Sequence, residues 1–282
     1  MTVDRIIENF ITKLKGFYSL KESRSLAYLA IESKMGLNRH QIFIQNDREV
    51  ESYTESELLK VLEELETGRP IQYILSETEF CGLKFSVDEN VLIPRPETEE
   101  LIYWIKENIA EYSRILDIGT GSGCIAVALK HFLPKAEVFA LDVSEKALEV
   151  ARKNAIINNS EIYFVQKNIL NDRLIDLPQF DVIVSNPPYV TVSEQNTMHR
   201  NILNFEPYSA LFVPDDKPLL FYNCIAEVSR EKLINGGSLY FEINEQFGDE
   251  VKKMLLNFGF YQVNVKRDLH GKERMVKALN RK

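Results

Sequence analysis

The sequence predicts an α/β protein in two parts: a small helical N-terminal region, then a mostly parallel seven-stranded sheet with helices on both faces. The first 68 residues show apolar spacing typical of helices and offer no strand candidate. From Ser113 onward, short β-branched runs alternate with helical segments, the order expected of a parallel sheet covered on both faces. The extended runs 261–265 and 274–279 can close this sheet as an antiparallel pair.

In the N-terminal region, apolar side chains recur at helical spacing from Ile6 to Leu14. A second helix is predicted over 26–35, ended by Gly36, and another over 57–66, ended by Gly68. Thr54 and Glu57 have the spacing of a capping box for that last helix. We expect a small bundle, either a structural appendage or a module that docks a partner.

The next segment differs in character, because short extended runs flank Gly82 and a proline-flanked arginine, Arg95, follows. This pattern predicts a β-hairpin that links two domains. The predicted division is a helical domain over 1–75, a hairpin linker over 76–95 and an α/β domain over 96–282.

Within the α/β domain, an amphipathic helix that carries Leu101, Ile102, Trp104 and Ile105 is predicted first, and five strands and four further helices follow before the closing pair. The strands are 115–118, 138–141, 162–165, 182–184 and 238–243, the last preceded by a turn at Gly236 and Gly237. The helices are 124–132, 146–158 with Ser144 as N-cap, 219–233 and about 247–257. The stretch 191–217 is expected to be irregular.

Composition narrows the class of protein. The chain has 282 residues, 45% hydrophobic, and 42 acidic against 34 basic side chains give a net charge of −8. This sign argues against a protein that grips nucleic acid through its phosphates. The sequence has neither a long apolar run nor an apolar leader, so we expect a cytoplasmic protein without membrane contact. Its three cysteines lack metal-ligand spacing, so no metal site is predicted.

A glycine-rich turn follows the first predicted strand. It reads Asp117-Ile-Gly119-Thr120-Gly121-Ser122-Gly123 and leads into a helix. Glycines let the backbone approach a ligand closely, and the helix N-terminus offers free N–H groups. The Gly-x-Gly-x-Gly spacing is not the dinucleotide fingerprint, which weakens a nicotinamide or flavin interpretation.

Two further strand ends add polar groups at the same edge. Asp142 ends the second strand, where a carboxylate can accept both hydroxyl protons of a ribose. With the glycine turn it indicates a cofactor that contains ribose and adenine. After the third strand, Asn168 can hydrogen-bond a base edge and Ile169 can pack on its face, although a plain polar loop is an equal interpretation.

The fourth strand ends in Asn186-Pro187-Pro188-Tyr189. Two prolines end the strand in a stiff loop at the cofactor edge. The Asn186 oxygen and the Pro187 carbonyl can each accept one N–H of a planar NH₂ group, and Tyr189 can stack on its plane. We predict these residues as the catalytic clamp for methyl transfer to a conjugated nitrogen, which depends on geometry more than on a strong base.

The sequence resembles the class I S-adenosylmethionine methyltransferases, and among them the HemK/PrmC family of peptide chain release factor N5-glutamine methyltransferases. The resemblance rests on the glycine turn, on Asn186 to Tyr189 and on four further blocks. These blocks are Gly68-Arg-Pro-Ile-Gln-Tyr73, Leu92-Ile-Pro-Arg-Pro-Glu-Thr-Glu99, Glu206-Pro207 with Ala210-Leu211, and Asp268-Leu-His-Gly-Lys-Glu-Arg274. The Leu92 to Glu99 block is the most diagnostic, because generic amino-methyltransferases share only the first two motifs.

The resemblance implies a Rossmann-like methyltransferase domain that uses S-adenosyl-L-methionine and leaves S-adenosylhomocysteine. It implies methyl transfer to the glutamine side-chain amide in the Gly-Gly-Gln loop of bacterial class 1 release factors. The implied cofactor residues are Asp117, Gly119, Thr120, Gly121, Ser122, Gly123, Asp142, Asn168, Ile169 and Asn186. Asn168 departs from the acidic residue common in the family at that position. By analogy, the N-terminal domain docks the release factor.

Two alternatives stay open at this point. An adenine-N6 methyltransferase acting on DNA or RNA also holds a conjugated NH₂ with an Asn-Pro-Pro-Tyr motif, but the acidic charge and the Leu92 to Glu99 block argue against it. A non-catalytic S-adenosylmethionine-binding protein is the other, and the intact clamp residues argue against that.

Overall fold

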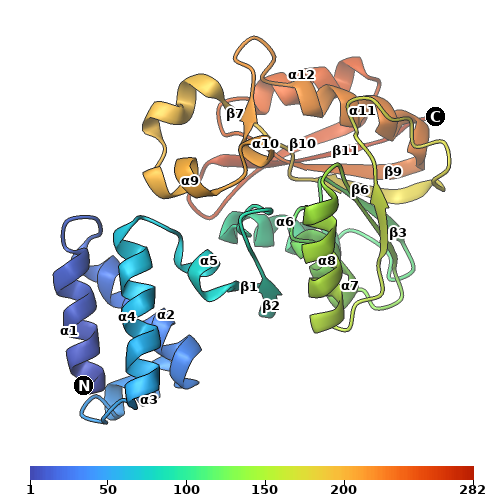
Figure 1. Cartoon of the computed structure of the whole chain (residues 1–282). Coiled ribbons are helices and arrows are strands. Elements are labelled where there is room, and N and C mark those ends of the chain that lie inside the picture. The colour runs from blue at the N-terminus through green and yellow to red at the C-terminus, as the bar shows by residue number, and fades with distance from the viewer. The chain divides into compact units, whose positions relative to one another are not determined.

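The computed structural model describes the backbone of residues 1–282 and every side chain except that of Thr197. The chain forms two compact units (Figure 1). The first consists of Met1–Glu77 and His199–Phe205, and the second of Thr78–Met198 and Glu206–Lys282. A short segment that follows the Asn-Pro-Pro-Tyr loop thus belongs to the N-terminal unit.

The first unit is helical. Its helices are α1 (Val3–Leu14), α2 (Leu20–Met35), α3 (Arg39–Ile44), α4 (Ser52–Glu66), α5 (Ile71–Leu75) and α9 (Arg200–Phe205). They enclose an apolar cluster of their own, which includes Phe10, Ile31 and Leu58. Asn201 of α9 donates from Nδ2 to the Tyr18 hydroxyl at 2.9 Å, which ties this distant segment to the bundle.

Local signals explain most of the helix ends. Ser19 caps α2 by accepting from the Glu22 backbone N–H, and Gly36 ends it in the left-handed conformation. The predicted capping box at Thr54 and Glu57 is wrong, because α4 begins at Ser52 with Glu51 as its N-cap. The Glu55 backbone N–H donates to the Glu51 carbonyl at 2.8 Å, so the first helical turn starts before Thr54.

A seven-stranded sheet forms the centre of the second unit. Its strands are β3 (Arg114–Ile118), β4 (Glu137–Asp142), β5 (Tyr163–Gln166), β6 (Phe180–Ser185), β9 (Leu233–Glu242), β10 (Tyr261–Arg267) and β11 (Glu273–Leu279). Their order is β10-β11-β9-β6-β3-β4-β5. Only β11 runs antiparallel to its neighbours β9 and β10, and the five remaining strands pair in parallel. The predicted mostly parallel sheet of seven strands is confirmed.

Helices cover both faces of this sheet (Figure 1). The helices α6 (Pro96–Lys106), α7 (Cys124–Phe132) and α8 (Glu145–Ile157) pack on one face, and α11 (Leu220–Lys232) and α12 (Gly248–Asn257) on the other. Side chains along a strand alternate between faces, so Val182 and Val184 of β6 join the first core while Ile183 joins the second. A central strand buried on both faces explains the unbroken apolar run.

The remaining elements are short. The strands β1 (Glu77–Phe80) and β2 (Leu83–Ser86) form the predicted hairpin around Gly82. The stretch expected to be irregular contains β7 (Val190–Thr191), the 3-10 helix η1 (Val192–Thr197), α9, α10 (Tyr208–Leu211) and β8 (Phe212–Val213). The predicted turn at Gly236 and Gly237 lies within β9, where a register shift absorbs both glycines. Among the described residues, no helix combines the length and apolar character needed to cross a lipid bilayer.

Candidate active site

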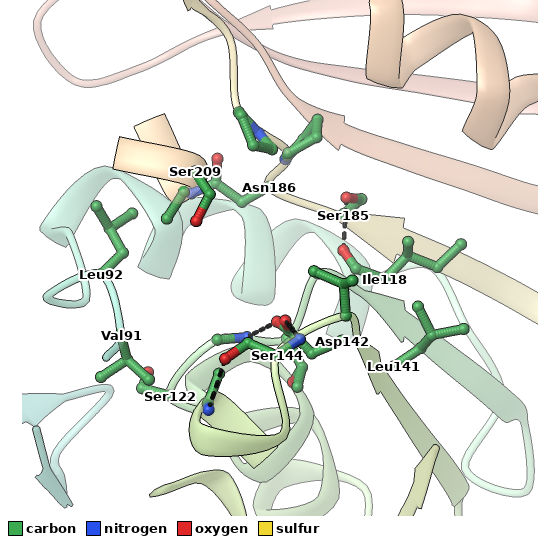
Figure 2. Close-up of a pocket in the computed structure, with 18 of the residues that line it drawn as sticks. Val91, Leu92, Ile118, Ser122, Leu141, Asp142, Ser144, Ser185, Asn186 and Ser209 are labelled. Atoms are coloured by element: carbon green, nitrogen blue, oxygen red, sulfur yellow. Dashed lines mark hydrogen bonds between the residues drawn. The ribbon is translucent and has the colours of Figure 1, made fainter. Parts of the chain in front are cut away.

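The carboxyl ends of the parallel strands open into a cavity of about 460 Å³ in the second unit (Figure 2). Loops after β3, β4, β5 and β6 contribute its walls, together with the segment before α6 and residues near α10 and α11. Predicted site residues that line the cavity are Gly119, Thr120, Gly121, Ser122, Asp142, Asn168, Ile169, Asn186, Pro187 and Pro188. The sheet topology therefore brings together residues that lie up to 69 positions apart in sequence.

The glycine turn is held by the neighbouring strand. The backbone N–H groups of Gly119 and Thr120 both donate to the Leu141 carbonyl, at 2.8 and 2.9 Å. Gly119 and Gly121 have positive φ angles of 73° and 53°, and a Cβ added to either would meet no atom within 4 Å. These two glycines therefore leave a backbone-lined space open beside the cavity, as a closely approaching ligand requires.

Two residues predicted at the cofactor, Asp117 and Gly123, lie behind the cavity wall, outside its lining. Gly123 has φ +79° and faces α8, where an added Cβ would lie 3.0 Å from the Ala151 Cβ. Asp117 is fully buried and accepts from the Thr120 hydroxyl at 2.6 Å. Burial raises the pKa of Asp117 to about 7, against the opposing effect of that hydroxyl. Both residues shape the turn from beneath.

Asp142 lies at the end of β4, facing the cavity (Figure 2). Its Oδ2 accepts from the Gly121 backbone N–H and its Oδ1 from the Ser144 backbone N–H, both at 2.9 Å. Burial raises the pKa of Asp142, while these N–H groups lower it in opposition. Each carboxylate oxygen has a second lone pair, so Asp142 can still accept two hydroxyl protons from a ligand.

Asn168 lines the cavity, but its side-chain oxygen already has a partner. Oδ1 accepts from the Leu170 backbone N–H at 3.0 Å, and the Asn168 backbone N–H donates to Asp172 Oδ2 at 2.6 Å. The oxygen predicted to meet a base edge thus shapes its own turn, as asparagine commonly does after a strand. The Ile169 side chain supplies an apolar wall beside it.

The Asn186 to Tyr189 segment divides between the cavity and the core. Asn186 donates from Nδ2 to Thr98 Oγ1 at 3.3 Å and lines the cavity with both prolines. Tyr189 lies outside the lining, packs against the second core and donates its hydroxyl to Glu242 Oε1 at 3.0 Å. The hydrogen bond to Glu242 fixes the hydroxyl end of Tyr189, and the stacking role of its partly buried ring stays a prediction.

Sequence reasoning missed Thr98 and Glu242, and it left Arg95 unassigned. Glu242 ends β9 at the same edge as Asp142, so the strand-end argument that found Asp142 also applies to Glu242. Arg95 lines the cavity, and its Nη2 pairs with Glu206 Oε1 at 2.6 Å. Glu206 is almost fully buried and also accepts from the Ile93 backbone N–H. Sequence alone shows none of these partnerships.

The sheet order, the glycine turn, the acid after β4 and the amide after β6 together define a class I methyltransferase. A family model for the methyltransferase small domain matches residues 97–205. The chain is also similar in fold to a methyltransferase from Pyrococcus furiosus of known crystal structure, with a TM-score of 0.54 and 19% identity, over 82% of this chain and all of that one.

Closer relatives identify the family. A family model for the PrmC N-terminal domain matches residues 7–75. The chain is 46% identical to the release factor glutamine methyltransferase of Flavobacterium psychrophilum, over 99% of both chains. It is 41% identical to that of Bacteroides thetaiotaomicron, over 98% of this chain and 99% of the relative. The chain belongs to the release factor glutamine methyltransferase family.

Proposed function

We propose that this enzyme transfers a methyl group from S-adenosylmethionine to the glutamine side-chain nitrogen in the Gly-Gly-Gln motif of bacterial class 1 release factors. The observation that carries the proposal is the Asn186 amide, whose nitrogen end is bonded to Thr98 while its oxygen end is left for a ligand of the cavity. The full-length similarity to two release factor glutamine methyltransferases supports the choice of substrate.

The cavity residues fit the proposed cofactor. Asp142 has two lone pairs for the hydroxyls of a ribose, and Gly119 and Gly121 leave space for close approach to the backbone. The apolar Ile169 wall suits the face of a base. Asn168 can offer its side-chain NH₂ to a ring nitrogen of adenine, and the second lone pair of its Oδ1 to the exocyclic NH₂.

The chemistry requires positioning, because an amide nitrogen shares its lone pair with the carbonyl and is a poor nucleophile. S-adenosylmethionine supplies a methyl group activated by a sulfonium, and the products are S-adenosylhomocysteine, the N-methyl amide and one proton. Asn186 Oδ1 and the Pro187 carbonyl each accept one N–H of the substrate amide. These contacts fix the NH₂ plane and increase the electron density on nitrogen as the new N–C bond forms.

We further propose a division of labour along the chain. Residues 96–282 carry the reaction, residues 76–95 connect the two parts and supply the cavity wall ahead of α6, and residues 1–75 add docking surface for the release factor. The separate apolar cluster of the helical unit supports this division, because that unit has its own core.

Tritium transfer from labelled S-adenosylmethionine tests the reaction. We expect label in a purified release factor, and neither in DNA nor in a sample without acceptor. A mass spectrum of the tryptic peptide that contains Gly-Gly-Gln should gain one methyl group on glutamine. Labelling of DNA instead would support the adenine-N6 alternative, and no labelling with intact cofactor binding would support a non-catalytic protein.

The first substitution to test is Asn186→Ala. Losing a positioned acceptor for the transition state should lower kcat by roughly a hundred- to a thousand-fold. Cofactor binding measured by calorimetry should stay close to that of the parent, because Asp142 and the glycine turn are unchanged. Methylation of a release factor at near the parent rate would contradict the clamp.

A further inference from the structure

Four side chains from distant parts of the second unit form a continuous hydrogen-bond chain. Asn186 Nδ2 donates to Thr98 Oγ1 at 3.3 Å, and the Thr98 hydroxyl donates to Glu242 Oε2 at 2.6 Å. The Tyr189 hydroxyl donates to the other oxygen, Glu242 Oε1, at 3.0 Å. Glu242 therefore accepts from one end of the Asn186 to Tyr189 loop directly and from the other end through Thr98.

Glu242 determines the direction of donation along this hydrogen-bond chain. An ionised carboxylate can only accept, so the single hydroxyl proton of Thr98 goes to Glu242. Thr98 Oγ1 can then only accept from Asn186, which must turn its Nδ2 toward Thr98. The Asn186 oxygen is consequently the end left for the cavity. Without this constraint, an asparagine amide could present either end.

We infer that Glu242 and Thr98 are positioning residues that orient the Asn186 amide, with its oxygen toward the substrate nitrogen. The inference rests on the proposed function, in which that oxygen accepts a substrate N–H. A reversed amide would present Nδ2 to the substrate NH₂, donor against donor, and the clamp would fail without any change in the cofactor site. Orientation of the Asn186 amide thus depends on a carboxylate that lies outside the cavity lining.

The surroundings of Glu242 fit a carboxylate kept for its charge. Only 1% of its surface is exposed, and each of its side-chain oxygens has a hydroxyl partner. Tyr222 from α11 donates to its backbone carbonyl at 3.2 Å. Burial raises the pKa of Glu242, while the hydroxyls of Thr98 and Tyr189 and the charge of Arg274 on β11 lower it; Glu97 on α6 raises it further. Burying an ionised carboxylate is costly unless it is hydrogen-bonded, and the two hydroxyl donors to Glu242 supply those bonds.

The decisive experiment reverses the direction of hydrogen-bond donation between Asn186, Thr98 and Glu242. Asn186→Asp places two carboxylates on the one Thr98 proton, so we expect kcat at saturating S-adenosylmethionine to fall at least about a hundredfold. Glu242→Gln lets Thr98 accept a hydrogen bond instead of donating one, so the Asn186 amide can reverse. We expect kcat to fall at least about tenfold. In the double variant, the introduced glutamine donates to Thr98 and Thr98 donates to the introduced aspartate.

The double variant also keeps the total charge of the parent. We therefore expect it to turn over at least about tenfold faster than Asn186→Asp alone. If the two losses multiply instead, the inference is wrong. Calorimetry of S-adenosylmethionine binding and circular dichroism on each variant show that the comparison is between folded proteins.

If Asn186→Asp or Glu242→Gln prevents folding, a second pair of variants tests whether Thr98 orients the Asn186 amide. Thr98→Val keeps the volume of the side chain but removes the hydroxyl that joins Asn186 to Glu242, so kcat should fall about 10- to 100-fold with little change in cofactor affinity. Thr98→Ser keeps the hydroxyl and should lose at most about fivefold. Equal losses in the two variants would mean that Thr98 only fills space.

The pH dependence of kcat supplies a readout that a packing role would not move. The ionised form of Glu242 orients Asn186, so kcat at saturating cofactor should fall as pH drops through its raised pKa. Glu242→Gln should lack this acid limb, and an unchanged limb would contradict the inference. If the parent enzyme labels no release factor, the proposed function fails; if it does so but the variants show no coupling, only this inference fails.

Discussion

At the scale of single residues, three carboxylates near the carboxyl ends of β3, β4 and β9 have different roles. Asp117 accepts a hydrogen bond from Thr120 inside the glycine turn, and Asp142 faces the cavity with lone pairs that remain free for a ligand. Glu242 is buried and accepts hydrogen bonds from hydroxyl groups. Burial raises the pKa of all three. The three carboxylates differ in their hydrogen-bond partners, and each of them can be tested by its own substitution.

Asp142→Ala should weaken S-adenosylmethionine binding, because it removes two hydroxyl acceptors and leaves the backbone N–H groups of Gly121 and Ser144 without their partner. The expected cost is about 1 to 3 kcal/mol, measured by calorimetry. Glu137→Ala is the matched control, since Glu137 begins the same strand β4 at its opposite end and pairs with Arg114. Equal weakening in both variants would exclude a direct contact of Asp142 with the cofactor.

At the scale of secondary-structure elements, the glycine turn depends on the close packing of the N-terminus of α7 against α8. Gly123 combines a positive φ with a contact that leaves no room for a Cβ against Ala151. Gly271, in the turn between β10 and β11, has a similar φ of +80° but meets no atom within 4 Å. The two positions therefore separate backbone strain from crowding.

We expect Gly123→Ala to lower the free energy of unfolding by about 2 to 4 kcal/mol, the sum of a positive-φ penalty and overpacking. Gly271→Ala should lose about 1 to 2 kcal/mol, from the backbone penalty alone. Urea denaturation of the two variants and the parent measures both values. Equal losses would show that α8 can move aside, and that close packing is not why a glycine stands at position 123.

At the scale of the whole molecule, the buried Asp117 couples folding to pH. Its pKa is about 7 in the folded protein and about 3.9 in an unfolded chain, so the folded state holds the proton more tightly. The resulting stabilisation is fully present below about pH 4 and is lost as pH rises through 7. The unfolding free energy of the parent should therefore fall by up to about 1.4 kcal/mol per pH unit between pH 5 and 7, relative to Asp117→Asn. Parallel stability curves for the two proteins would contradict this.

The helical unit can be tested as a docking module by deleting residues 1–75. Cofactor binding should persist, because every residue of the cavity and of its two apolar cores belongs to the second unit. Methylation of an intact release factor should fall at least about a hundredfold. A short peptide that contains Gly-Gly-Gln should react at a similar rate with both proteins. Equal loss of cofactor binding, peptide methylation and factor methylation would mean that the helical unit is structural.

Sequence alone determined the fold and the edge of the sheet that carries the site, because both follow from local patterns. The period of apolar residues gives strands and helices, and the ends of parallel strands must share one edge, which brought Gly119, Asp142 and Asn186 together. Tertiary structure alone decided that Tyr189 turns to the core, that residues 199–205 join the helical unit, and which way the Asn186 amide points. The partners of Thr98 lie 88 and 144 positions away, at Asn186 and Glu242. Hydrogen bonds over such separations leave no trace in local periodicity, since they exist only once the sheet has brought its strand ends together.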